Sequence, residues 1–134
     1  MAEKQYDPTS KKVFVFGSNL AGLHLGGAAK YAYDELGAMW GLGEGISMGK
    51  TGHMSYALPT VRTDGSPMSL DEIKLRVQHF LTAAKYRDDL KFFVTRIGCG
   101  IAGYTDEQIA PMFQNAPRNC ELPEAWLALC NTSK

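Results

Sequence analysis

Val13-Phe14-Val15-Phe16-Gly17-Ser18-Asn19 is the stretch that decides the fold of this chain. Its first four residues are apolar and favour the β conformation, and an unbroken run of this kind predicts a central strand that is buried on both faces. Turn-forming residues follow it. Residues 26–36 then carry alanines and a leucine at helical spacing, and Gly37 is well placed to end that helix. The predicted order is a buried strand, a glycine-rich loop and a helix.

The same order recurs in the second half of the chain. Ser69 and Glu72 have the spacing of a capping box, and the apolar stripe that follows them predicts a long helix. A strand at 92–95 leads into a second glycine-rich loop, 96–104, and Thr105 opens another helix. Strands that alternate with helices predict a parallel or mixed sheet with helices on both faces.

Three segments are less regular. Residues 38–52 are rich in glycine and have no clear period, which predicts a mobile loop or a lid over a ligand. Residues 55–58 predict a second strand, which we expect Pro59 to stop. Residues 124–129 fit either a final helical turn or a strand.

Length and charge limit the classes of function. The chain has 134 residues, the size of one domain, which we assign to 1–134. Lys and Arg total 14 and Asp and Glu total 14, so the net charge is zero and a polymeric nucleic-acid partner is disfavoured. No apolar run approaches the roughly 20 residues of a membrane span, and the polar segment 1–12 lacks the apolar stretch of a secretory signal. We expect no membrane partner, and the sequence does not indicate an oligomeric state.

Cysteine and histidine usage adds two expectations. The three cysteines, Cys99, Cys120 and Cys130, do not suggest a disulfide framework and predict a reducing, cytoplasmic location. They and the three histidines are scattered, so we expect no metal site and no cofactor.

Both glycine-rich loops follow a strand and precede a helix, so they should lie at the same edge of the sheet. A loop that enters a helix offers unpaired backbone N–H groups and the positive end of the helix dipole, and glycine lets a ligand approach them closely. Two such loops predict a pocket for a phosphate-bearing nucleotide. The alternative is that these glycines serve only turn geometry and close helix packing.

The two loops also resemble those of a known family. Gly17-Ser18-Asn19-Leu20 with Gly26-Gly27-Ala28-Ala29-Lys30 is similar to the first ligand loop and following helix of macrodomains. Ile97-Gly98-Cys99-Gly100-Ile101-Ala102-Gly103-Tyr104 resembles their second phosphate loop, above all in the branch that removes ADP-ribose from acidic side chains. The likeness spans about 13–113, and the chain also resembles short, uncharacterised macrodomain-like proteins of phages and bacteria.

This resemblance implies a three-layer α/β/α fold with a mixed central sheet, short at its N-terminus, and a pocket for ADP-ribose. Asn19 would hydrogen-bond a ribose hydroxyl, and Tyr104 would stack on or close over the sugar. The ligand-binding residues that the resemblance implies are Gly17, Ser18, Asn19, Leu20, Ala21, Gly26, Gly27, Ala28, Gly98, Cys99, Gly100, Ile101, Ala102, Gly103 and Tyr104.

The sequence departs from the hydrolytic branch at two points. Ala102 stands where that branch has an acidic residue, and residues 61–62 align with its catalytic lysine but contain none. Glu44 and Asp106 are therefore the candidate catalytic carboxylates. Cys99 is either a nucleophile with His24 or His53 as its base, or a small residue that fits a tight loop.

Three functions follow from these features. The chain binds ADP-ribose or a related NAD-derived nucleotide, or it is a hydrolase that removes ADP-ribose or a phosphate from an ADP-ribose-type ligand, or it is an interaction protein with a vestigial pocket. An exposed aromatic patch at Trp40 would favour the last. Arg96 and Lys50 are further candidate phosphate ligands.

Overall fold

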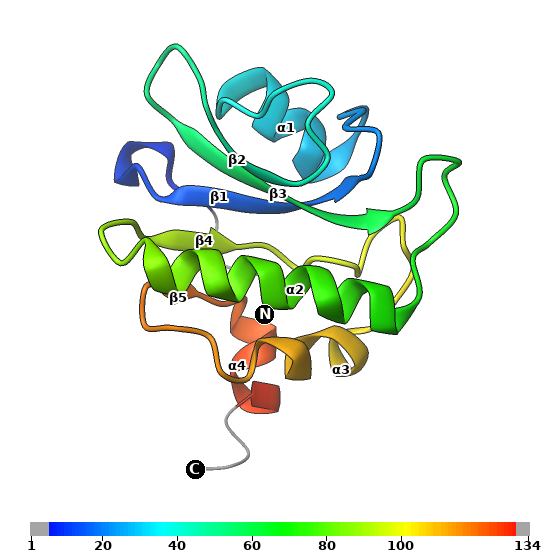
Figure 1. Ribbon diagram of the computed structural model, residues 1–134. Helices are drawn as coiled ribbons and strands as arrows, with labels where there is room; N and C mark the ends of the chain where they lie inside the picture. The colour runs from blue at the N-terminus through cyan, green and yellow to red at the C-terminus, as the bar shows by residue number, and fades with distance from the viewer. Residues whose placement is uncertain (1–5, 131–134) are drawn as a thin grey trace.

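The computed structural model describes residues 6–130, which form a five-stranded sheet with helices on both faces (Figure 1). Residues 1–5 and 131–134 of the predicted domain lie outside the described residues. The strands are β1 (Val13–Asn19), β2 (Gly45–Met48), β3 (Met54–Val61), β4 (Phe92–Val94) and β5 (Cys120–Glu121). The helices are α1 (Gly27–Glu35), α2 (Leu70–Tyr86), α3 (Asp106–Ile109) and α4 (Glu124–Cys130), with 3-10 helices η1 (Pro8–Ser10) and η2 (Ala110–Phe113).

The sheet is mixed, with the strand order β2-β3-β1-β4-β5. β1 runs parallel to β3 and to β4, and β4 runs parallel to β5, whereas β2 is antiparallel to β3. The carboxyl ends of β1, β3 and β4 therefore meet at one edge, on the right in Figure 1. This confirms the predicted α/β class with a mixed central sheet.

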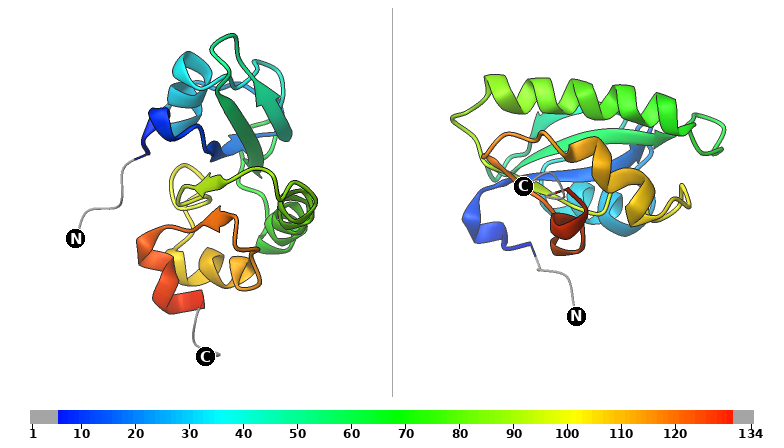
Figure 2. Two further views of the ribbon diagram at one scale, coloured as in Figure 1. Left: turned by 90° about the vertical axis from the view of Figure 1, so that its left-hand side faces the viewer. Right: turned by 90° about the horizontal axis from the view of Figure 1, so that it is seen from below.

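β1 is buried on both faces, as its apolar run predicts. Val13 and Val15 belong to the larger core cluster, which is packed under α2, α3 and α4. Phe14 and Phe16 belong to the smaller cluster, which is packed under α1. Successive side chains of a strand point to opposite faces, so one four-residue run joins the two layers of the core. Figure 2 shows α1 on one side of the sheet and the other three helices on the opposite side.

The connections create a crevice between β1 and β4. The loop after β1 leads to α1 on one face, and the loop after β4 leads to α3 on the other. Neighbouring parallel strands whose loops leave toward opposite faces form the place where ligands bind in open α/β sheets. The prediction that both glycine-rich loops lie at one edge of the sheet is confirmed.

Residues 38–52 are not the structureless loop or lid that their composition suggests. They contain β2, which pairs with β3 from Gly45↔Ala57 to Met48↔Met54. A Cβ on Gly43 would lie 2.5 Å from the Leu20 carbonyl oxygen, so glycine here permits close packing of two backbones. At position 43, glycine is thus explained by packing.

The second strand also extends beyond the predicted stop at Pro59. β3 continues to Val61, because Pro59 lies past the last residue paired with β2 and beside a register shift between Ser18 and Asn19 of β1. A residue without an N–H group is tolerated at such an irregular position.

Residues 124–129, for which the sequence fits either a helical turn or a strand, belong to helix α4, which buries Trp126 and Cys130. Among the described residues, no helix has the length and apolar character that a membrane span requires.

The end of α1 crosses the turn between β2 and β3 at very close range. A Cβ on Gly37 would lie 2.4 Å from the Gly49 nitrogen and 2.5 Å from the His53 carbonyl oxygen. Gly37 also has a φ of +82°, and its carbonyl oxygen accepts a hydrogen bond of 2.9 Å from the Ser47 hydroxyl. Only glycine satisfies both the backbone conformation and the close approach.

This contact predicts a large loss of stability in Gly37→Ala. Gly52→Ala is the matched control, because Gly52 has a similar φ of +86° but no atom within 4 Å of its Cβ position. We expect Gly52→Ala to lower the free energy of unfolding by about 1 kcal/mol through backbone strain alone. Gly37→Ala should cost roughly 1–3 kcal/mol more, because the backbones must also separate. Urea unfolding of both variants measures this difference, and equal losses would contradict the account of the crossing.

Candidate ligand-binding site

A pocket of about 550 Å³ lies at the carboxyl ends of β1, β3 and β4. It is formed by the end of β1 with the following loop and the start of α1, by the end of β3 with the turn that follows it, and by the loop after β4. Its lining is formed by Gly17, Ser18, Asn19, Leu23, Leu25, Gly26, Gly27, Ala28, Ala29, Thr60, Val61, Gly65, Thr95, Arg96, Ile97, Gly98, Cys99, Gly100, Ile101 and Ala102. Its volume is typical of a site for a small organic ligand.

The N-terminus of α1 faces this pocket without a side-chain cap. Its N-cap residue is Gly26, and the first helix bond of α1 runs from the Lys30 nitrogen to the Gly26 carbonyl oxygen at 3.2 Å. Within residues 6–130, the N–H groups of residues 27–29 have no hydrogen-bond acceptor. By contrast, α2 and α3 begin with complete capping boxes. The uncapped helix start leaves free donors and the positive end of a dipole at the pocket.

The loop after β4 supplies a second set of donors. It is held by its own backbone bonds, from the Gly103 nitrogen to the Gly100 carbonyl oxygen at 3.0 Å and from the Tyr104 nitrogen to the Gly98 carbonyl oxygen at 2.9 Å. These bonds leave the N–H groups of Gly98 and of residues 100–102 without an acceptor in the described part of the chain. Free N–H groups on a folded loop form a concave site for an anion.

Arg96 is the charged residue of the pocket lining. Its Nε and Nη2 atoms donate to the two carboxylate oxygens of Asp106 at 3.0 and 2.8 Å. The indole of the buried Trp126 donates to the same carboxylate at 2.7 Å. Asp106 thus ties the pocket loop to α4. These donors, Arg96 first, hold the pKa of the Asp106 carboxyl below its ordinary value.

Cys99 lines the pocket as a protonated thiol. Burial, together with the neighbouring Asp106 carboxylate, raises the pKa of Cys99 to about 12. The two bases proposed for it are engaged elsewhere: His24 Nε2 lies 2.8 Å from the Met39 carbonyl oxygen, and His53 contacts Thr51. The described contacts do not bring a histidine to Cys99, so its small size explains its place in this tight loop.

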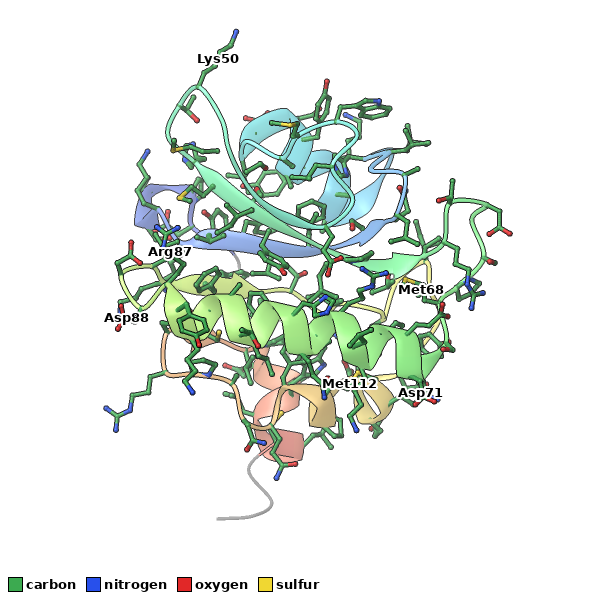
Figure 3. The ribbon with its side chains drawn as sticks, in the orientation of Figure 1. Lys50, Met68, Asp71, Arg87, Asp88 and Met112 are labelled. Carbon is green, nitrogen blue, oxygen red and sulfur yellow. The ribbon has the colours of Figure 1, made fainter. Side chains whose placement is uncertain are left out.

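The structure brings most of the predicted ligand-binding residues together in one lining. Leu20, Ala21, Gly103 and Tyr104 do not belong to it. The Tyr104 hydroxyl instead donates to the Met68 carbonyl oxygen at 2.6 Å, and Figure 3 labels Met68 near the amino end of α2. The Asn19 side chain is engaged twice with the Leu23 backbone, at 2.9 Å each, so it shapes the first loop.

Neither candidate carboxylate lines the pocket. Glu44 forms an ion pair with Arg76 of α2 and lies 3.2 Å from His79 Nδ1. Asp106 is engaged as described above. Lys50 is also remote, because it projects from the turn between β2 and β3, at the end of the sheet opposite to Met68 (Figure 3).

The residues that sequence reasoning missed come mainly from segments that lack a loop motif. Thr60 and Val61 end β3, and Thr95 follows β4, so their signal is their position after a strand. Leu23 and Leu25 lie between the two glycine groups of the first loop. Gly65 comes from the turn between β3 and α2, whose approach to the pocket is visible only in three dimensions.

Trp40 is not part of the pocket lining. It is about half exposed, at 46%, and its ring centroid is 5.4 Å from that of Tyr33. Met39 beside it is also exposed. The aromatic patch considered from the sequence therefore exists, and its role in binding a partner stays a prediction.

Comparisons with family models, with curated proteins and with solved structures found no match to this chain.

The Asp106 network predicts a specific response to acid. Because the folded protein lowers the pKa of this carboxyl, its stabilising effect is complete above the ordinary value of 3.8 and is lost as the pH falls through the folded-state pKa. We expect Asp106→Ala to cost about 2 kcal/mol at neutral pH, because the Trp126 indole loses its acceptor. When the pH is lowered from roughly 5 to 2, the free energy of unfolding should fall less in this variant than in the unsubstituted protein, because the variant lacks the Asp106 carboxyl.

Asp89→Ala is the matched control for urea unfolding over this pH series. Asp89 also accepts two hydrogen bonds from one arginine, Arg87, but this pair lies at the surface. Exposed ion pairs contribute little, so this variant should stay close to the unsubstituted protein. Equal losses in the two variants at neutral pH would contradict the role given to Asp106.

Proposed function

We propose that this chain is a macrodomain-like binding module for ADP-ribose or a related NAD-derived nucleotide. The observation that carries the proposal is the convergence of two sets of unpaired backbone N–H groups, from the start of α1 and from the loop after β4, on one pocket. Donors of this kind bind phosphate without a dedicated side chain. Two sets on one cavity suit a diphosphate.

The rest of the lining supports a nucleotide with further groups attached. Leu25 and Ile101 are largely exposed apolar side chains of the pocket, on opposite loops. They offer contact surface for a sugar or a base beyond the phosphates. The resemblance of both loops to macrodomain loops selects ADP-ribose from among such ligands.

Binding is better supported than hydrolysis. Among the described lining residues there is no carboxylate, histidine or lysine to act as a general base. The thiol of Cys99 is protonated at neutral pH, and the hydroxyl of Ser18 donates to the Gly43 carbonyl oxygen. We therefore propose recognition of the ligand without turnover.

The three cysteines are free thiols in the structure. This state suits a reducing compartment, and we propose the cytoplasm, where NAD-derived nucleotides are formed.

The proposal predicts selective binding of ADP-ribose in calorimetric titration, with AMP and NAD as comparators. We expect a dissociation constant in the micromolar range, which corresponds to a binding free energy on the order of −8 kcal/mol. Gly100→Leu should abolish binding and leave the thermal unfolding temperature nearly unchanged. The reason is that Gly100 lines the pocket, and a Cβ on it meets no atom within 4 Å.

Glu44→Gln is the control, because Glu44 lies outside the pocket and its change should leave the affinity intact. Binding of none of the three nucleotides would overturn the choice of ADP-ribose. Unchanged affinity in Gly100→Leu would refute the role of the second loop.

A further inference from the structure

Thr60 is a buried residue whose hydroxyl has no hydrogen-bond partner among the described residues. The residue lies near the carboxyl end of β3, is only 4% exposed and lines the pocket. Its carbonyl oxygen accepts a bond of 2.9 Å from the Met68 nitrogen, but no described residue bonds to its hydroxyl. Among the described residues, the fully buried side-chain polar atom without a partner is His24 Nδ1, so the Thr60 hydroxyl oxygen is not fully enclosed and is free to bond to a ligand in the pocket that Thr60 lines.

Three buried serine hydroxyl groups of the sheet have partners. Ser55 donates to the Leu36 carbonyl oxygen at 2.7 Å, and Ser47 donates to the Gly37 carbonyl oxygen at 2.9 Å. Ser18, next to the pocket, donates to the Gly43 carbonyl oxygen. Thr60 differs from these three serines, because its hydroxyl has no partner and it lines the pocket.

Gly17 leaves open the space that this hydroxyl adjoins. A Cβ on Gly17 would lie 3.6 Å from Thr60 Oγ1 and 3.8 Å from the Gly98 nitrogen. Two unpaired donors therefore border the same small volume. Both distances are ordinary van der Waals contacts and the φ of Gly17 lies outside the left-handed region, so alanine would fit here. The fold does not require glycine at this position.

We infer that the Thr60 hydroxyl and the Gly98 N–H together bind one anionic oxygen of the ligand in the space beside Gly17. This inference rests on the proposed function and adds to it the side chain that reads the phosphate group. A phosphate oxygen has several lone pairs and accepts two donors at once. A hydroxyl that donates to a charged oxygen forms one of the stronger hydrogen bonds in proteins, so the unpartnered Thr60 hydroxyl is well suited to bind the ligand.

Three variants test the assignment by titration with ADP-ribose. Thr60→Val removes the hydroxyl at nearly constant shape and should weaken binding about tenfold or more. Thr60→Ser keeps a hydroxyl and should bind within about threefold of the unsubstituted protein. Gly17→Ala leaves Thr60 in place but fills the adjoining space, and it should weaken binding at least as much as Thr60→Val. Thr51→Val, on the exposed turn between β2 and β3, is the control and should not change the affinity.

The possible results separate the two levels of the argument. If the unsubstituted protein does not bind ADP-ribose, the proposed function fails and this inference fails with it. If it binds and both Thr60→Val and Gly17→Ala bind equally well, the inference alone is overturned. Loss of affinity in Thr60→Val that Thr60→Ser does not rescue would also overturn it, because the hydroxyl would then not be the group that matters.

Discussion

The burial of β1 on both faces is the constraint on which the rest of the structure depends. Four consecutive apolar residues supply side chains to two separate cores, one under α1 and one under α2. Their burial fixes β1 in the middle of the sheet, with parallel partners on each side. The position of the pocket follows, because loops after adjacent parallel strands then leave the same edge toward opposite faces.

Glycine serves two different purposes in this chain. At Gly37 and Gly43, a Cβ would collide with neighbouring backbone, so glycine there holds segments together and contributes to stability. At Gly26 and Gly100, a Cβ would meet nothing within 4 Å, so packing alone does not explain the residue. These two glycines line the pocket, and there the missing side chain leaves room for a ligand to reach the backbone. The distinction depends on what surrounds each residue, which composition does not reveal.

The predictable part of the fold is the part encoded by local patterns. The apolar run of β1 and the capping boxes at Ser69 and Thr105 fixed the elements that they begin, because each signal lies within a few residues. β2 was missed because four residues among glycines carry no period of their own, and it is a strand through its pairing with β3. The pocket edge was predictable from the order of strands and loops, whereas the contributions of Thr60 and Gly65 depend on tertiary contacts. The sequence makes Asp106 a candidate catalytic carboxylate, because its pairing with Arg96 and Trp126 depends on tertiary structure.

The way charge is distributed around the pocket bears on what it does. Asp106 lies near the pocket loop, but its carboxylate is saturated by a guanidinium, an indole and a thiol. Glu44 is likewise paired with α2. Because neither acid lines the pocket, the electrostatic field inside it comes from backbone N–H groups, the start of α1 and the guanidinium of Arg96, which attract anions but do not act as general bases at neutral pH. A site built in this way suits a phosphate in its ground state, and this supports our proposal that the chain binds a phosphorylated ligand.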